Sequence, residues 1–110
     1  MTRDELIAAL KKATGPCALL DADIWREIGR PDMRTHHGRR CILCYTDSID
    51  AAMTLVPEGL RWRVSSVPKH GYAGASVSNG SILATATQEW EGHHFIPAIA
   101  LCIAALRARK

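Results

Sequence analysis

PAIALCIAALRARK, residues 97–110, is the stretch that decides the predicted fold. Pro97 suits the first turn of a helix, where the N–H that proline lacks would have no intrahelical partner. The apolar side chains that follow spread around most of the helix; they are Ile99, Leu101, Cys102, Ile103 and Leu106. A helix that is apolar nearly all round is covered on more than one side. We therefore expect a buried C-terminal helix on which the rest of the chain packs.

The segments before this helix predict a small antiparallel sheet for the helix to lie across. Residues 60–64, LRWRV, alternate apolar and charged side chains, which is typical of a strand with one solvent-exposed face. We expect a second strand at Tyr72–Val77 and a third at Ser81–Thr87, with a tight turn at residues 78–80 between them. Residues Gln88–His94 are predicted to be a polar excursion that leads into the last helix.

Three helices are predicted ahead of the sheet. The first covers Asp4–Ala13, and Thr2 is expected to be its N-cap in a capping box. The second covers Asp21–Ile28, with Asp21 as its N-cap. The third follows Thr46, whose hydroxyl suits the N-cap position.

This order of elements predicts an α+β fold, in which a small antiparallel three-stranded sheet packs with about four helices as an α/β sandwich. A chain of 110 residues is enough for a single domain, residues 1–110, with one modest core. The net charge is +3 and the pI is about 8.8, with ten arginines and four lysines. This mild excess permits contact with nucleic acid or an acidic protein but requires neither.

The chain is expected to be a cytoplasmic protein without a membrane segment. Its first ten residues, MTRDELIAAL, lack the apolar core of a signal peptide. The longest apolar run, Phe95–Leu106, has twelve residues, whereas a helix that crosses a bilayer needs about 20. Four cysteines without a secretory signal indicate a reducing compartment and free thiols. Cys17 and Cys102 are expected to behave as small core residues.

Residues 31–40, PDMRTHHGRR, are polar, contain proline and glycine, and predict a loop between two folded segments. Binding residues concentrate on loops of this kind. Arginine pairs bidentately with phosphate or carboxylate, so such a loop suits a nucleic acid or an acidic protein surface. The predicted partner-binding residues here are Arg34, His36, His37, Arg39 and Arg40.

Cys41 and Cys44 form a Cys-x-x-Cys pair beside this loop, and three interpretations stay open. The favoured one places one or both thiols in a buried position beside a strand or helix start, because apolar residues fill the spacer. Zinc would require four ligands, with His36 or His37 and a residue from elsewhere completing the site. A redox pair would need a βαβ context and a cysteine at a helix N-terminus. We therefore predict no cofactor and no metal site.

Three residues of the sheet region are also predicted to contact a partner. Arg61 and Arg63 should point to the face opposite Trp62, where an exposed arginine pair makes a binding surface. Trp90 is either an exposed interface anchor or a lid over the core, and both alternatives stay open. An apolar patch around Trp62 or Trp90 is a candidate homodimer face.

The sequence does not predict an enzyme. His93 and His94 invite a catalytic interpretation, but no nucleophile and orienting carboxylate can be assigned beside them. The chain contains no Gly-x-Ser-x-Gly, His-Glu-x-x-His, P-loop or dinucleotide-binding motif.

Four motifs match one family when they are taken together. They are the Ala-Thr-Gly-Pro end of the first helix at residues 13–16, the Leu-Asp to Ile-Gly pattern at 20–29, TDSIDAAMTLVPEGLRWRV at 46–64 and HHFIPAIALCIAALRARK at 93–110. As a set they resemble the phage ABA sandwich domain, a family of small phage and prophage proteins. The resemblance covers most of the chain. It implies an α/β sandwich around a curled sheet, encoded among phage accessory genes, and it implies no catalytic residues.

The positions that match the family pattern can be explained as caps, turns and core residues: Gly15, Asp21, Ile49, Ala52, Pro57, Gly59, Trp62, Ala98, Leu101 and Leu106. Residues 34–44 have no counterpart in that pattern. We therefore expect the individual function of this chain to lie there.

The function predicted from these features is that of a non-enzymatic phage or mobile-element accessory protein. Its expected partner is a host protein or ribonucleoprotein complex in the bacterial cytoplasm, and the expected role is inhibition of a host defence system, of the anti-CRISPR type. One alternative is a small nucleic-acid-binding protein that uses the basic loop and the arginines of the sheet face. A second alternative is a zinc-stabilised structural module.

Overall fold

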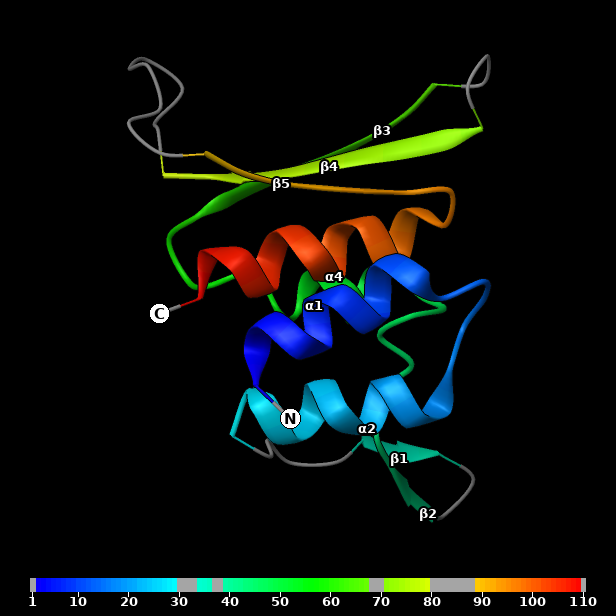
Figure 1. Ribbon diagram of the computed structural model, residues 1–110. Helices are drawn as coiled ribbons and strands as arrows, with labels where there is room; N and C mark the ends of the chain where they lie inside the picture. The colour runs from blue at the N-terminus through cyan, green and yellow to red at the C-terminus, as the bar shows by residue number, and fades with distance from the viewer. Residues whose placement is uncertain (1, 30–33, 37–38, 68–70, 80–88, 110) are drawn as a thin grey trace.

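The computed structural model describes residues 2–29, 34–36, 39–67, 71–79 and 89–109, and only the backbone at 34–36, 39–41, 66 and 67. The elements in chain order are α1 (Arg3–Lys12), α2 (Ala18–Glu27), β1 (Arg34–His36), β2 (Arg39–Cys41), α3 (Ile49–Met53), β3 (Arg61–Val67), β4 (Tyr72–Ser78), β5 (Glu89–His94) and α4 (Pro97–Ala108). β3, β4 and β5 form an antiparallel sheet in that order, and α4 packs against it (Figure 1). The predicted α+β fold is confirmed.

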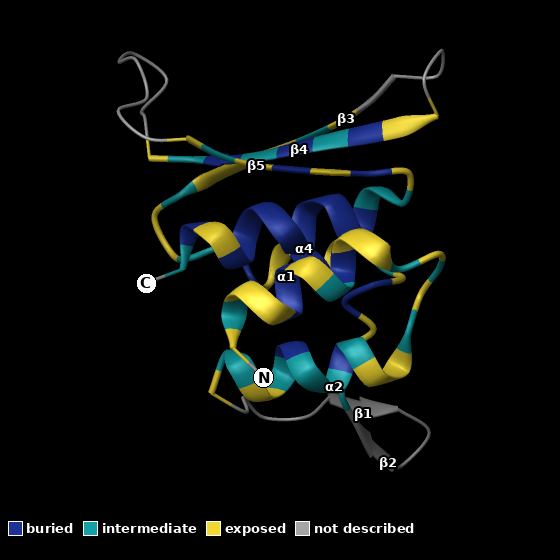
Figure 2. Cartoon of the chain, viewed as in Figure 1, coloured by how far each residue is buried: buried dark blue, intermediate teal, exposed yellow. Residues whose placement is uncertain are grey.

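Helix α4 lies at the centre of the molecule. The sheet covers one side of α4, and α1 and α3 pack against other sides, with α2 beyond α1 (Figure 1). Ten of the twelve residues of α4 are buried, and the helix is dark blue along most of its length in Figure 2. Burial of this apolar surface is the main stabilising contribution, at about 25 cal/mol per Å². The prediction of a C-terminal helix covered on more than one side is confirmed.

The three-stranded sheet has one packed face and one open face. Along β4 the buried residues Ala73, Ala75 and Val77 face α4, and the alternate residues are more exposed. β3 and β4 agree with the strands predicted from residues 60–64 and 72–77. An antiparallel sheet commonly has this arrangement, with one face on the core and one toward solvent.

The third strand lies in a segment that was predicted to be a polar excursion. β5 covers Glu89–His94, so the prediction for residues 88–94 is wrong, and the strand predicted at 81–87 lies outside the described residues. The inward positions of β5 are Trp90, Gly92 and His94. Two of these three are not apolar side chains, so the alternation that marks a buried strand face is hidden in the sequence.

Gly92 explains why this strand needs no large side chain on its packed face. A Cβ at position 92 would lie only 2.8 Å from the Ala104 nitrogen and 2.9 Å from the Ile103 Cβ, and still closer to the Ala100 carbonyl oxygen. The backbone of β5 therefore lies directly on the α4 backbone. The small side chains of Ala100 and Ala104 on α4 permit this contact.

Two of the predicted helix caps are wrong for one physical reason. α2 begins after Cys17 rather than at Asp21, and α3 begins after Ser48 rather than Thr46. The Asp21 carboxylate accepts hydrogen bonds from the Thr46 backbone N–H and hydroxyl, both at 2.8 Å. Each side chain thus satisfies the other across 25 residues instead of capping its own helix. The predicted Thr2 cap is confirmed, because its hydroxyl accepts a hydrogen bond from the Glu5 N–H at 3.2 Å.

Residues 31–40 are not a simple loop. β1 and β2 pair as an antiparallel hairpin, with Arg34 opposite Cys41, Thr35 opposite Arg40 and His36 opposite Arg39. This part of the loop prediction is therefore wrong. Three-residue strands are too short to produce a readable alternation in the sequence. Residues 31–33 and 37–38 lie outside the described residues.

Candidate functional site

The predicted partner-binding residues fall in two separate regions. Arg34, His36, Arg39 and Arg40 belong to the β1–β2 hairpin, and Arg61, Arg63 and Trp90 belong to the three-stranded sheet. The hairpin and the sheet lie at opposite ends of the molecule (Figure 1). His37 lies outside the described residues. The structure therefore does not bring the predicted residues into one surface.

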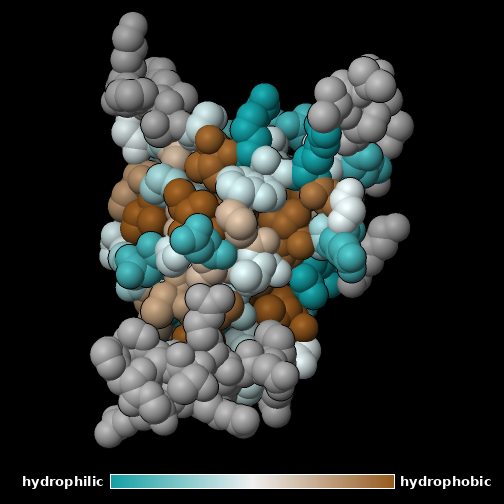
Figure 3. Space-filling view, turned by 180° about the vertical axis from the view of Figure 1, so that it is seen from behind, coloured by the Kyte–Doolittle hydropathy of each residue, from teal (hydrophilic) through white to brown (hydrophobic). Residues whose placement is uncertain are grey.

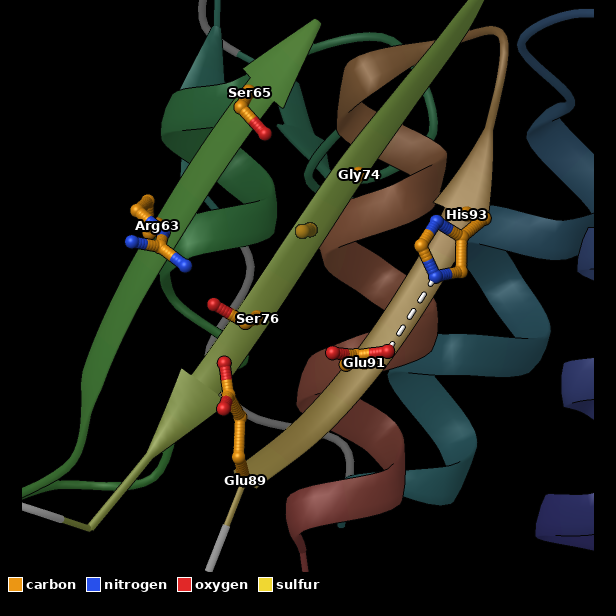
Figure 4. Close-up of a pocket in the computed structure, with 8 residues that line it drawn as sticks. Arg63, Ser65, Gly74, Ser76, Glu89, Glu91 and His93 are labelled. Carbon is orange, nitrogen blue, oxygen red and sulfur yellow. Dashed lines mark ion pairs between the residues drawn. The ribbon is translucent and has the colours of Figure 1, made fainter. Parts of the chain in front are cut away.

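The face of the sheet turned away from α4 is called the outer face below. Strand register arranges its side chains in three rows across β3, β4 and β5: Arg61–Ser78–Glu89, Arg63–Ser76–Glu91 and Ser65–Gly74–His93. Figure 4 shows labelled members of these rows on the same side of the sheet, with α4 behind. Cross-strand neighbours of this kind lie close enough to form one continuous surface.

The rows place arginine along one edge of the outer face and glutamate along the other. In each row a small residue of β4 lies between the β3 and β5 side chains, and these small residues leave a shallow hollow of about 110 Å³ between the two edges. Neighbouring strands are about 4.8 Å apart, so β3 and β5 are separated by roughly 10 Å. Among the described residues, no ion pair joins Arg61 or Arg63 to Glu89 or Glu91.

The charges of the outer face therefore remain available to a second molecule. Glu91 approaches His93 on its own strand, with 3.6 Å between Oε2 and Nε2, but both side chains are well exposed. An exposed pair of this kind contributes little to stability. Two arginines and two glutamates balance one another, so this face is dipolar rather than basic.

Two of the three tryptophan residues, Trp62 and Trp90, belong to the sheet and lie on the face opposite the outer face. Trp62 pairs with the buried Val77, and its side chain is 38% exposed at the sheet edge. Trp90 is half-buried and packs against the core. Of the two alternatives for Trp90, this position favours a lid over the core. Seen from behind, the hydrophobic residues are interrupted by hydrophilic and neutral ones (Figure 3).

His94 holds β5 to the first part of the chain. It is 2% exposed, and its Nε2 lies 2.7 Å from the Ala13 carbonyl oxygen. Its Nδ1 accepts a hydrogen bond from the Ile96 N–H at 3.0 Å. The neutral tautomer with the proton on Nε2 satisfies both partners. His94 therefore has a structural explanation, whereas His93 belongs to the outer face.

The groups with shifted pKa values lie inside the protein. Burial raises the pKa of the Asp21 carboxyl, and the two hydrogen bonds from Thr46 oppose that effect. Burial also raises the pKa of Tyr45 and of the Cys102 thiol. The Cys102 thiol donates a hydrogen bond to the Tyr45 carbonyl oxygen at 3.1 Å. Each of these three groups is part of the packing around α4 and α2, and none of them lines the outer face.

The cysteine predictions have mixed outcomes. Cys102 is buried as predicted, whereas Cys17 is half-buried at the start of α2. Cys44 is exposed, so it is not a buried thiol of the favoured interpretation, and the side chain of Cys41 lies outside the described residues. Among the described residues, no three His, Cys, Asp or Glu side chains form a cluster that could hold a metal ion. The side chains of Cys41, His36 and His37 lie outside that description, so the structure does not test the zinc alternative at this segment.

Sequence reasoning missed most of the outer face. Glu89, Glu91, Gly74 and Ser76 enter the site through strand pairing, and the β5 register depends on a strand that the sequence did not reveal. The signal that could have found them is the alternation Glu-x-Glu-x-His at residues 89–93, read as one exposed strand face.

Comparison with known protein families, with curated proteins and with solved structures finds no match. The resemblance to the phage ABA sandwich domain therefore stays a prediction that depends on the sequence motifs. In the part of the chain that the structure describes, no helix is both long enough and apolar enough to cross a membrane.

Proposed function

We propose that this protein is a non-enzymatic accessory protein that binds a macromolecule of a bacterial host. The supporting observation is the β1–β2 hairpin at one end of the molecule. Four of its six paired residues are basic or histidine: Arg34, His36, Arg39 and Arg40. Arginine binds carboxylate and phosphate groups in a fixed, bidentate geometry. The hairpin is therefore the main contact surface for the host partner.

The arrangement of ionisable groups supports binding rather than catalysis. An active site brings perturbed titratable groups into a cleft where a substrate can reach them. Here the shifted groups Asp21, Tyr45 and Cys102 are almost completely buried. The side chains of the outer face line two open hollows, of about 110 and 450 Å³, and none of the three shifted groups lines either of them.

The proposed partner is a protein or ribonucleoprotein of a host defence system, as for an inhibitor of the anti-CRISPR type. The sequence resemblance to phage and prophage accessory proteins supports this choice. An inhibitor of this kind needs a surface that blocks its target and does not need an active site. The step from a sequence resemblance to phage proteins to an inhibitory role is an analogy between proteins.

Direct binding to nucleic acid is the second candidate function, and it is favoured only at the hairpin. The three arginines of the hairpin carry a local positive charge, whereas on the outer face Glu89 and Glu91 offset Arg61 and Arg63. Each phosphate neutralised on duplex DNA contributes about −0.9 to the slope of log K against log salt. A hairpin with three phosphate contacts would therefore give a slope of roughly −2.7.

A plating assay tests the proposed function directly. Bacteria with an active CRISPR-Cas system are challenged with a targeted phage while they express the wild-type chain, R34A/R39A/R40A or the control K11A/K12A, which removes exposed positive charges from α1. We expect wild type and the control to restore plaque formation and the hairpin variant to lose that effect. The proposal fails if wild type leaves restriction unchanged across the defence systems tested. A gel shift whose salt dependence matches the predicted slope would favour the nucleic-acid function instead.

A further inference from the structure

We propose that the outer face of the sheet binds the outer face of a second copy of this chain. The two copies are related by a two-fold axis that runs parallel to the strands and lies over β4. This inference does not depend on the proposed function, because it uses the opposite end of the molecule from the hairpin.

The order of charges across the sheet is the observation that carries the proposal. Each charged row has arginine on β3, serine on β4 and glutamate on β5. A two-fold axis over β4 places β3 of one copy above β5 of the other and keeps each row at the same height. Arg61 then faces Glu89 of the second copy, and Arg63 faces Glu91. Because the interface is isologous, each pair occurs twice.

The alternative two-fold orientation is disfavoured by the same charges. An axis in the plane of the sheet but perpendicular to the strands would place β3 above β3. The arginines of the two copies would then face each other, and so would the glutamates. Like charges opposite one another across an interface repel and suppress that arrangement. The charge pattern therefore selects one relative orientation of the two sheets.

The middle strand has side chains that allow two sheets to approach. Its outward positions include Gly74, Ser76 and Ser78, which leave the hollow between the charged edges. Packed sheets lie about 10 Å apart, with their strands crossing at about 30° because of sheet twist. Arginine and glutamate side chains are long enough to meet across that distance, whereas the short residues of β4 leave room along the axis.

One exposed aromatic residue also lies on the axis. Tyr72 begins β4 on the outer side and is 57% exposed. A residue of the central strand faces its own counterpart across this axis, so the two Tyr72 rings would meet. Aromatic pairs stabilise an interface beyond the effect of the area that they bury. This contact differs from the patch around Trp62 or Trp90 that the sequence suggested for a homodimer.

A second copy fits this face better than a polyanion or a uniformly basic protein. Either of those partners would meet one favourable edge and one repulsive edge. A surface with glutamate opposite the arginines and arginine opposite the glutamates is required, and this chain itself supplies it. The resulting dimer would carry its two β1–β2 hairpins at opposite ends, which makes it bivalent for any hairpin ligand.

Charge-reversed variants, measured alone and then as mixtures, test the proposal. Sedimentation velocity at about 100 μM protein and low salt measures association of wild type, R63E and E91R. We expect wild type to form dimers that weaken as salt rises. Each single reversal replaces two attractions by two repulsions and should weaken dimerisation at least about tenfold.

Mixing the two variants is the decisive measurement. In a heterodimer of R63E with E91R, the reversed residues face each other and the second pair is native, so dimerisation should return. The separate pair R61E and E89R should behave in the same way, and circular dichroism checks that all four variants fold. A monomeric wild type at low salt would overturn the proposal. So would single reversals that dimerise normally, or a mixture that stays monomeric.

Discussion

The two faces of the three-stranded sheet each contain a glycine, but only one of the two positions excludes a larger side chain. On the packed face, a Cβ at Gly92 would lie 2.8 Å from the Ala104 nitrogen, so the position has no room even for a methyl group. On the outer face, a Cβ at Gly74 would meet its nearest atom, His93 Nδ1, at 3.5 Å, an ordinary van der Waals contact. One face is closed by a helix, whereas the other has space for another molecule. Glycine is therefore required for packing in β5, whereas in β4 it leaves open space on the surface.

Of the substitutions that test this difference between the two faces, Gly92→Ala should have the largest effect on stability. The added methyl group would collide with the α4 backbone, and neither β5 nor α4 can shift without disturbing the core. We expect the free energy of unfolding to fall by about 3 kcal/mol or more, or the chain not to fold. Urea denaturation followed by circular dichroism measures this change. An unchanged unfolding midpoint would show that β5 does not lie on α4 as described.

The adjacent histidines provide a matched pair for the same comparison. His94→Ala removes a buried ring that binds two backbone groups, and it leaves the Ala13 carbonyl and the Ile96 N–H unsatisfied. We expect a loss of about 2–3 kcal/mol in the free energy of unfolding. His93→Ala removes an exposed side chain with one weak ion pair and should change that energy by less than about 0.5 kcal/mol. Equal losses in the two variants would contradict the assignment of His94 to the inside and His93 to the outside.

The parts of the fold that the sequence predicted are those with a regular apolar pattern. α4 was recognisable because its apolar residues surround the helix, and β3 was recognisable from the alternation at residues 60–64. β5 was missed because its packed face consists of Trp90, Gly92 and His94, of which the last two contact the core through backbone proximity and hydrogen bonds. A hydropathy pattern does not register either kind of contact.

Long-range pairing limits the prediction of the candidate site in the same way. Asp21 and Thr46 each have the local sequence context of an N-cap, but they bind each other instead. Arg61 and Arg63 were predicted as surface residues from their own strand. Their relation to Glu89 and Glu91 required the registers of β3 with β4 and of β4 with β5. Such pairings arise from tertiary packing and leave little trace in a short window of sequence.

Asp21 is a buried ionisable group, in contrast to the exposed charged residues of the outer face. Burial raises the pKa of Asp21 above its ordinary value of 3.8, so the folded protein holds this proton more tightly than the unfolded chain does. The stabilising contribution of Asp21 is therefore complete at low pH and is lost as pH rises through the raised pKa. In the variant D21N, the side-chain amide oxygen can still accept the hydrogen bonds from Thr46, and the amide does not ionise.

The stability of D21N relative to wild type should therefore increase as pH rises from about 3.5 to 7. Urea denaturation of both proteins at about pH 3.5, 5 and 7 gives this difference directly. A difference that is constant, or that changes in favour of wild type, would mean that the bonds from Thr46 outweigh the effect of burial on the carboxyl.

Gly74→Ala should have the smallest effect and completes the pair with Gly92→Ala. The new methyl group would face the hollow of the outer face, and alanine costs less conformational entropy than glycine in a strand. We expect the free energy of unfolding to stay the same or rise by about 0.5 kcal/mol, measured under the conditions used for Gly92→Ala. If Gly74→Ala destabilised the chain as much as Gly92→Ala, the outer face would already be packed. A second sheet would then have no room to lie on it, because the hollow along β4 is where the two copies approach.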